Sequence, residues 1–296
     1  MDDSPQASPP LPRRKRHFPP TAVFCAVVLA AFAATALWAG ATQAWYAWRD
    51  QPAPWNAQDF AHRYAPPGPG HVLGTDGLGR SVALRLAAGS WIAFQVGVVS
   101  SAIAIPLGML LGALAGYFGG KTDDFVNWLC ATFSAIPGLL FVLVLAAIVG
   151  KGLFGVFLAI GLTTWIGVCR LVRAEVVRQK AFGYVLAAQA LGFSDARILF
   201  RHILPNVMHL GLVTFTLRFP ASIGTEVFLS FLGIGVQDLP SWGLMISSGR
   251  LRLWQGAWWE LASVTAAIFL VVLAFHLAGD RLRDRLDPRA ASLARK

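Results

Sequence analysis

Six long apolar segments are separated along this chain by more polar stretches of varied length. A helix needs about 20 apolar residues to cross the hydrocarbon core of a bilayer, and each of these segments is at least that long. The period-two alternation of apolar and polar residues that membrane barrel strands require is absent. The pattern therefore predicts six membrane-spanning helices, at residues 21–45, 91–117, 125–149, 153–172, 207–235 and 258–278.

A polar, basic island at residues 184–206 separates the fourth and fifth apolar segments. The residues 182–191 predict a short helix that ends at Gly192, because glycine readily adopts the left-handed conformation that stops a helix. One face of this helix has small central residues that another protein can approach closely. The residues on that face, spaced at i, i+3, i+4 and i+7, are Tyr184, Ala187, Ala188 and Leu191.

The second part of the island predicts another short helix. Ser194 or Asp195 is suited to its N-cap, and the helix is expected to end before Pro205, because proline disrupts a helix interior. Two short helices joined by a glycine elbow, set between two spans, are expected at the membrane surface.

Composition agrees with a membrane protein. The 296 residues are 56% hydrophobic and 14% charged, with a mean hydropathy of +0.57, which is too apolar for a soluble domain. Cys25, Cys130 and Cys169 all lie in predicted spans, far apart in sequence, so they indicate small buried residues and suggest no disulfide, metal or redox role. The chain is predicted to be an all-α integral membrane protein.

The positive charge follows the predicted topology. Most of the 25 Lys and Arg residues lie in three clusters, 13–16, 170–201 and 281–296. Basic residues favour the cytoplasmic side of a membrane, so six crossings place both termini inside. The net charge of +10 thus reflects orientation, because the sequence predicts no basic soluble domain of the kind that binds nucleic acid.

These observations divide the chain into five parts. They are a disordered basic cytoplasmic tail (1–19), a first transmembrane helix (20–45), a periplasmic segment (46–90), a five-helix core (91–279) that contains the region 182–206, and a cytoplasmic tail (280–296). The first helix has an alternative interpretation as a signal peptide cleaved near residues 39–41. Its apolar run is longer than a typical signal core and leads into an aromatic belt at 45–48, which favours an uncleaved anchor.

The spacing of Ala187-Ala188, Gly192 and residues 203–205 resembles the "EAA" coupling motif of bacterial ABC importer permeases, the membrane subunits on which a cytoplasmic ATPase docks. Leu186 stands where that family usually has glutamate, which removes a charge from the docking helix. The alternative is an amphipathic helix that rests on lipid headgroups. The residues that the resemblance assigns to ATPase coupling are Tyr184, Leu186, Ala187, Ala188, Leu191, Gly192, Ile203, Leu204 and Pro205.

Two further stretches narrow this resemblance. Residues 71–80, HVLGTDGLGR, are similar to the "LGTDxxGRD" signature of dipeptide, oligopeptide and nickel importer permeases, in the second of their two membrane subunits, although Ser81 replaces the usual second aspartate. Asp76 and Arg80 are expected to pair or to cap a short helix. A glycine-rich phosphate loop is excluded here because the G-x-x-x-x-G-K-S/T pattern is missing. The tail is similar to the same subfamily at 229–237, 240–243 and 279–289.

The resemblance implies a type I ABC importer (MetI-like) permease fold and a set of partners. These partners are a homologous second permease subunit, two cytoplasmic ABC ATPase subunits that bind ATP and Mg, an extracytoplasmic solute-binding protein and membrane lipid, with no nucleic acid. No catalytic residue and no metal ligand is assigned to this chain. The implied cargo is di- or oligopeptides first, then nickel chelates or related small solutes, and the implied location is the bacterial inner membrane.

Two charges lie well inside the fifth predicted span, Arg218 and Glu226. Charges inside a membrane are costly unless they face protein or water, so both are candidates for the translocation path. Eight residues separate them, about 12 Å along a helix, so they are not expected to pair with each other. Arg218 either contacts cargo carboxylates or has a structural ion-pair partner. Pro106, Pro137 and Pro220 are expected to bend their spans, as pivots or as passive kinks.

Two other function classes stay open at this stage. An ion-coupled secondary transporter would more often show more helices, internal repeats and interrupted charged spans. An intramembrane enzyme would need paired catalytic groups, and His276 has no Gly-x-Ser-x-Gly elbow to accompany it. The six spans and the basic island favour the importer permease.

Overall fold

The computed structural model describes residues 20–286, and every regular element in that range is helical. The predicted tail at 1–19, with the basic cluster 13–16, and residues 287–296 of the predicted tail 280–296 lie outside the described residues. Residues 280–286 of that tail continue the last helix. Short 3-10 turns occur at Pro54–Asn56, Phe60–His62 and Leu253–Gln255. The longer helices are α1 (Pro20–Trp48), α2 (Val82–Phe118), α3 (Gly120–Ser134), α4 (Gly138–Val149), α5 (Leu153–Lys180), α6 (Gly183–Ala190), α8 (Leu204–Phe231), α9 (Trp242–Arg250) and α10 (Trp259–Leu286), with α7 (Asp195–Arg197) and a π-helical segment (Ile198–Ile203) before α8.

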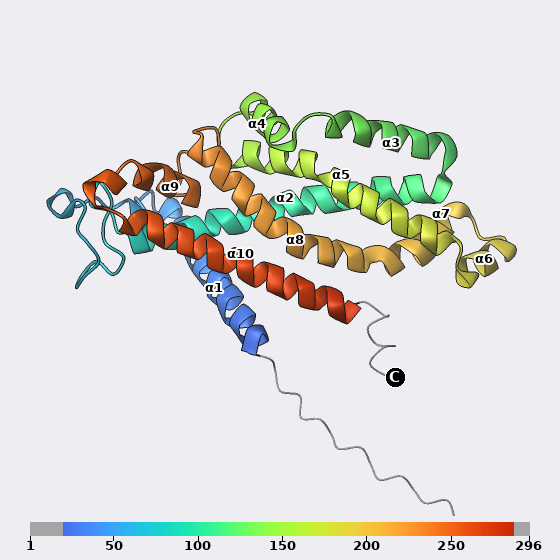
Figure 1. The fold of residues 1–296 in the computed structure, drawn as a ribbon, viewed down its shortest axis with the longest axis horizontal. Coiled ribbons are helices and arrows are strands. Elements are labelled where there is room, and N and C mark those ends of the chain that lie inside the picture. Colours follow the sequence, from blue (N-terminus) through green and yellow to red (C-terminus); the bar gives the residue numbers. More distant parts are fainter. Residues whose placement is uncertain (1–19, 287–296) are drawn as a thin grey trace, which may run out of the picture.

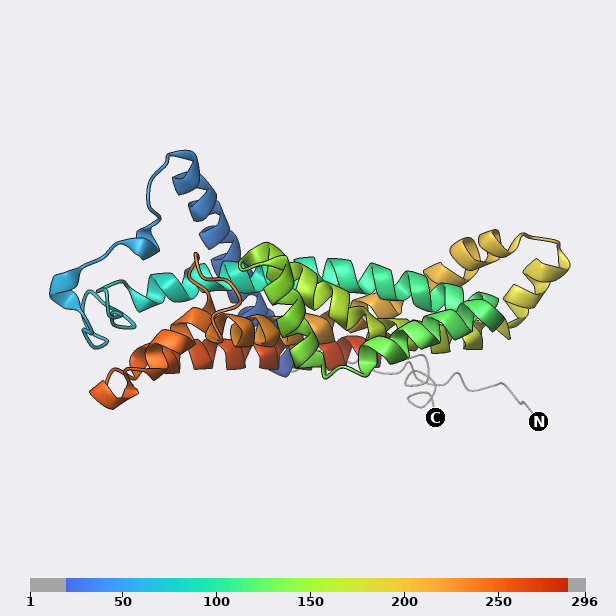
Figure 2. The ribbon, with the colours of Figure 1, turned by 90° about the horizontal axis from the view of Figure 1, so that it is seen from above.

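The long helices α2, α5, α8 and α10 run along the length of the molecule, and α1 crosses them obliquely (Figures 1 and 2). The elbow with α6 and α7 lies at one end, and the segment between α1 and α2 lies with α9 at the other. The predicted all-α membrane fold is therefore confirmed. Five described helices are long and apolar enough to cross a membrane, and α3 with α4 forms a sixth candidate.

The third predicted span is not one helix. The structure divides it into α3 and α4, which meet at an angle of 87°. Pro137 lies at the break because it has no backbone N–H and its ring clashes with the preceding helical turn. The expectation of a continuous helix over 125–149 is therefore wrong, and Pro137 marks a corner of the backbone.

Several helices extend beyond their predicted spans. The second span begins at Val82, well before residue 91, where Ser81 Oγ accepts the Leu84 N–H at 3.5 Å as an N-cap. The helix of the fourth span continues to Lys180. Hydropathy missed both extensions because the additional turns contain polar residues. Pro106 and Pro220 lie inside α2 and α8 without ending either helix.

The backbones of α2 and α5 are in close contact along a glycine seam, formed by Gly108, Gly112 and Gly116. A Cβ atom placed on Gly108 would lie 2.6 Å from the Trp165 carbonyl oxygen, and one on Gly116 would lie 2.8 Å from that of Arg173. Small residues spaced by four allow such an approach between membrane helices. This seam fixes α5 against α2 and so positions the elbow that follows α5.

Two of the three cysteines, distant in sequence, meet between α3 and α5. The sulfur atoms of Cys130 and Cys169 lie 3.9 Å apart, and both side chains are buried as free thiols. Cys25 is buried separately on α1. Their packing among apolar neighbours fits the expectation of small buried residues, although the proximity of two of them was not predicted.

Candidate coupling surface and translocation cavity

The elbow at the end of the bundle has the geometry of a Schellman helix stop. Gly192 adopts a left-handed φ of 76°. The Phe193 N–H donates to the Ala188 carbonyl at 3.1 Å, and the Gly192 N–H donates to the Gln189 carbonyl at 2.9 Å. The predicted left-handed stop at Gly192 is thus confirmed, and a side chain at this position would strain the turn.

The face of α6 that the structure exposes is not the face that the sequence predicts. Val185 and Ala188 are buried against Ile198, Leu199 and Ile203, at 0% and 5% exposed. Ala188 therefore cannot lie on a docking face, and the sequence placed it wrongly, because a helical wheel gives spacing but not the direction of the protein core. The residues of α6 and its end that are exposed, here named the coupling surface, are Tyr184, Leu186, Ala187 and Leu191.

The island's second helix does not end before Pro205. The structure continues from α7 through the π-helical segment into α8, and Pro205 lies in the first turn of α8. The Leu204 N–H bonds to the Leu199 carbonyl, five residues back. A proline ring clashes with the carbonyl four residues before it in an α-helix, and the wider π turn accounts for its acceptance here. Ile203 is buried, Leu204 is half-buried and Pro205 is exposed.

Hydrogen bonds connect the elbow to the bundle. The Tyr117 hydroxyl, at the end of α2, donates to Asp195 Oδ1 at 2.7 Å. Lys180 Nζ donates to the Tyr117 carbonyl at 2.6 Å, and the Tyr184 hydroxyl donates to Gln179 Oε1 at 2.6 Å. The elbow is therefore bonded to the ends of both α2 and α5. The sequence analysis missed Tyr117, although a tyrosine at the end of an apolar run is a recognisable signal of a polar contact at the membrane edge.

Arg218 lines a cavity of about 350 Å³ between α8, α5 and the corner of α3 with α4. Its guanidinium lies against Gly167, where any Cβ atom would clash with Nη2. Within residues 20–286 the side chain forms no ion pair. The other polar side chains at this cavity are Ser134, Thr163, Thr164 and Thr225.

Glu226 does not lie at that cavity. Its side chain is 1% exposed, and Ser230 Oγ donates to Glu226 Oε1 at 2.6 Å. Ser230 Oγ in turn accepts the Val236 N–H at 2.9 Å, which fixes the turn after α8. Glu226 is therefore buried within the chain and hydrogen-bonded to Ser230, and it does not line the Arg218 cavity, while its candidate place on the translocation path stays a prediction. The sequence places both charges on one helix, but it does not show which side of that helix packs against neighbouring helices.

The glycine-punctuated segment before α2 is folded around Asp76. Asp76 Oδ1 accepts the Leu78 and Arg80 N–H groups, and Asp76 Oδ2 accepts Arg80 Nε at 2.7 Å. The predicted pairing of Asp76 with Arg80 is confirmed, and Arg85 Nε lies 3.6 Å from the same carboxylate. Trp259 Nε1 donates to the Thr75 carbonyl at 3.0 Å, which attaches this segment to α10.

A smaller contact supports the same segment. The His62 ring donates to the Asp59 carboxylate at 2.7 Å, and this hydrogen bond holds the pKa of Asp59 below its ordinary value. Gly79 lies so close to the Asp59 backbone that no side chain fits there. The glycine of the signature thus serves close packing.

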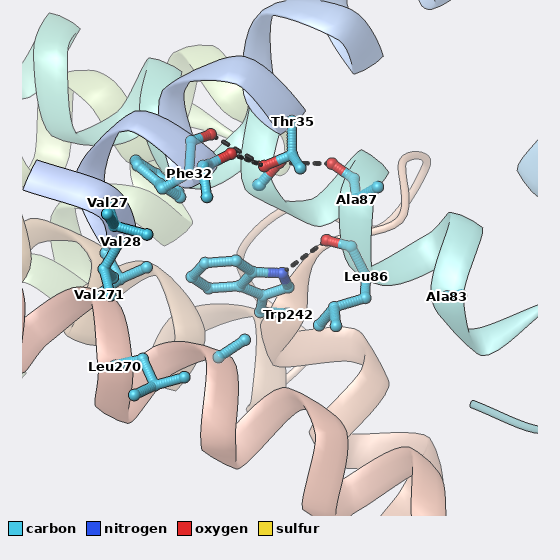
Figure 3. Close-up of a pocket in the computed structure, with 13 residues that line it drawn as sticks. Val27, Val28, Phe32, Thr35, Ala83, Leu86, Ala87, Trp242, Leu270 and Val271 are labelled. Atoms are coloured by element: carbon cyan, nitrogen blue, oxygen red, sulfur yellow. Dashed lines mark hydrogen bonds between the residues drawn. The ribbon is translucent and has the colours of Figure 1, made fainter. Parts of the chain in front are cut away.

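A second cavity, of about 370 Å³, lies between α1, α2 and α10 and is bordered by Trp242 (Figure 3). The indole Nε1 of Trp242 donates to the Leu86 carbonyl at 3.0 Å. Thr35 and Ser90 border the same cavity, with their hydroxyl oxygens 3.3 Å apart. No charged side chain lines it, so it offers no site for an ion.

The described residues contain no cluster of three or more His, Cys, Asp or Glu side chains able to hold a metal ion. The bend expected at Pro137 is confirmed, but its sharpness, 87°, and the division of the span into two helices were not predicted.

Comparison with known proteins identifies related sequences over most of the chain. Residues 104–292 match the family described as "Binding-protein-dependent transport system inner membrane component". The oligopeptide transport system permease protein OppC of Bacillus subtilis is 40% identical over 225 residues, which cover 76% of this chain and 73% of that protein. The dipeptide permease protein DppC of Bacillus subtilis is 38% identical over 233 residues, 78% of this chain and 73% of the other.

Two further matches extend this finding. The glutathione transport system permease protein GsiD of Pectobacterium atrosepticum is 36% identical over 254 residues, which cover 83% of this chain and 82% of that protein. Among solved structures, a chain of the MetNI methionine ABC transporter in an inward-facing conformation aligns with a TM-score of 0.52 and 19% identity, over 67% of this chain and 95% of the other. At that identity the structural match shows a shared fold.

Proposed function

Because this chain belongs to the family of inner membrane components of binding-protein-dependent transport systems, we propose that it forms one wall of the peptide pathway in an ATP-driven importer. It is a permease subunit of a peptide ABC importer in the inner membrane. The observation that carries this conclusion is the 40% identity to an oligopeptide permease over 225 residues. Ion-coupled secondary transport and intramembrane catalysis gain no support from these relatives.

The energy source is a separate ATPase that docks on the coupling surface. Leu186 and Leu191 are 52% and 74% exposed at the end of the bundle, where apolar side chains are available to a partner. Behind them, the buried Val185 and Ala188 hold α6 in place. ATP and Mg are bound by two such ATPase subunits, and the apolar Leu186 makes this docking contact less dependent on charge than the usual glutamate.

The complex also contains a homologous second permease subunit and an extracytoplasmic binding protein. The coupling surface and the segment between α1 and α2 lie at opposite ends of the molecule (Figure 1). We assign the first end to the inner side of the membrane and the second to the outer side, where cargo arrives. Counting α3 with α4 as one crossing gives six spans, an even number that places both termini on the same side of the membrane, and we assign that side to the cytoplasm. This assignment agrees with the basic residues of the elbow region.

The cargo is a di- or oligopeptide, with nickel chelates as the second candidate. The relatives are named for oligopeptide, dipeptide and glutathione transport, and all three cargo types are peptides with free carboxylates. Closure of the ATPase pair moves the coupling surfaces toward each other, and the bundle switches between inward-open and outward-open states. Arg218, on α8, faces the path that this switch opens.

The test is reconstitution of the full complex. The tagged chain, purified from native membranes in mild detergent, should retain an ABC ATPase and a second permease, and proteoliposomes of the complex with its binding protein should import a labelled dipeptide only with ATP. Uptake of the labelled dipeptide that is driven by an ion gradient and needs no ATP would contradict the proposal. A purified complex that lacks any nucleotide hydrolase would contradict it as well.

A further inference from the structure

The cavity at Arg218 combines a positive side chain with a corner in a membrane helix. Its walls come from α8, α5 and the two sides of the α3–α4 break, and its volume is about 350 Å³. Cavities that hold small ligands begin at about 300 Å³. This volume is large enough for one end of a peptide and too small for a whole long peptide. The cavity can therefore hold only part of a cargo molecule at a time.

Arg218 has no charge partner in the part of the chain that the structure describes. The ion pairs formed by residues 20–286 do not include it. A guanidinium inside the membrane without a counter-charge raises the free energy of the folded protein, and such residues usually mark the route of a charged substrate or ion. The guanidinium carries five N–H donors in a planar fork that matches the two oxygens of a carboxylate.

Gly167 keeps the guanidinium at the cavity. A side chain at residue 167 would occupy the position of Arg218 Nη2. The hydroxyls of Thr163, Thr164 and Thr225 donate to backbone carbonyls of their own helices, and being uncharged they supply no counter-charge for the arginine. The cavity is therefore lined by one positively charged side chain, Arg218, and by no negatively charged one.

The helix corner adds to this positive potential. Gly138 and Leu139, the first residues of α4, line the same cavity, and Pro137 at the N-cap offers no side chain to accept their N–H groups. The N-terminus of a helix carries a partial positive charge, and broken membrane helices direct such ends at anionic groups of substrates. The arginine is the main attraction, and α4 reinforces it.

From these observations we propose that Arg218 binds a carboxylate of the peptide cargo inside the membrane, in the cavity between α4, α5 and α8. This inference rests on the proposed function as a peptide importer. The alternative is that an acidic side chain of the second permease subunit neutralises Arg218 in the complex, which would make the residue structural.

The test compares two peptides that differ only at the C-terminus. The intact importer with its own binding protein is reconstituted with the wild-type chain, with Arg218→Gln, which removes the charge, and with Arg218→Lys, which keeps it. Uptake of a neutral dipeptide with a free C-terminal carboxylate is divided by uptake of the same dipeptide as its C-terminal amide. The preference of the binding protein is common to all variants, so it cancels when the ratios are compared.

We expect Arg218→Gln to lower this ratio about tenfold, as loss of a charge-assisted hydrogen bond predicts. Arg218→Lys should lower it less, because a single ammonium replaces the bidentate contact. Arg49→Gln, a matched change at an exposed arginine after α1, should leave the ratio at its wild-type value.

An unchanged ratio in Arg218→Gln would overturn the carboxylate assignment. Loss of the second permease subunit from the purified Arg218→Gln complex would assign the residue to an intersubunit ion pair. A wild-type importer that transports neither peptide would contradict the proposed function itself, so the two failures are distinguishable.

Discussion

The hydroxyl of Tyr117 donates a 2.7 Å hydrogen bond to the carboxylate of Asp195, 78 residues away in sequence. This bond joins the end of α2 to the first residue of α7. Since Lys180 Nζ also donates to the Tyr117 carbonyl, one tyrosine connects α2, the end of α5 and the elbow. These hydrogen bonds attach the elbow to α2 and α5, which pack against each other along the glycine seam.

The first prediction concerns this bond. Tyr117→Phe removes the hydroxyl and keeps the ring, so the elbow should move with less effect on α2. We expect fewer peptides imported per ATP hydrolysed, with a loss of stability of about 1 kcal/mol. The ratio of peptide uptake to phosphate release in proteoliposomes measures the first effect, and thermal unfolding measures the second.

Tyr46→Phe is the matched control, because Tyr46 lies in the last turn of α1, a helix that packs against α2 and α10. It should leave the transport stoichiometry unchanged. Equal effects of the two substitutions would show that the Tyr117 hydroxyl has no special part in coupling.

The second prediction separates the two sides of α6. A cysteine cross-linker should capture the ATPase from Ala187→Cys, which is exposed, and should not capture it from Ala188→Cys, which is 5% exposed. The native Cys25, Cys130 and Cys169 are buried and give little background. Gel electrophoresis after cross-linking in membranes reads out the result. Efficient capture from Ala188→Cys with none from Ala187→Cys would reverse the assigned orientation of α6.

The third prediction concerns Asp76. Its carboxylate accepts two backbone N–H groups and the Arg80 side chain, while it is 3% exposed. Asp76→Asn removes the negative charge and leaves Arg80 and Arg85 without it, which should lower the free energy of unfolding by about 3 kcal/mol. Differential scanning of the purified chain measures this change.

Asp50→Asn is the comparison, since Asp50 is exposed just after α1. This substitution should change the free energy of unfolding by no more than about 0.5 kcal/mol. If Asp76→Asn unfolded at the same temperature as the wild type, the Asp76 network would have no role in stability.

The fourth prediction concerns the glycine seam. At Gly112 a Cβ atom would meet the Cys169 carbonyl oxygen, so Gly112→Ala should force α2 and α5 apart and destabilise the chain by about 1–3 kcal/mol. Gly224, inside α8, has open space around it, and Gly224→Ala should be neutral or slightly stabilising. Thermal unfolding of both variants in one detergent tests the difference, and equal melting temperatures would contradict close contact at the seam.

Hydropathy predicted most of the spans because a bilayer requires long apolar helices whatever their packing. The proline at residue 137 indicated a bend, but average hydropathy does not register a single proline between two apolar stretches, so the division of this span into two helices at 87° was not predicted. The sequence analysis also expected Pro205 to follow a helix end, because only the surrounding backbone reveals that a π turn accommodates the ring.

The candidate sites were partly predictable. Gly192 and the Asp76–Arg80 pair follow from local sequence, where the interacting groups are a few residues apart. The inward direction of Ala188 and the burial of Glu226 depend on contacts with distant segments, which no local pattern contains. For the same reason the bond of Tyr117 to Asp195 emerges only from the three-dimensional structure.

The contact of Gly108 and Gly112 with α5 has a consequence for leakage. Two helices whose backbones touch leave no room for water or solute between them, so the interface between α2 and α5 is sealed. Ions therefore have no passage between these two helices. A conducting route has to lie elsewhere in the bundle or against another subunit.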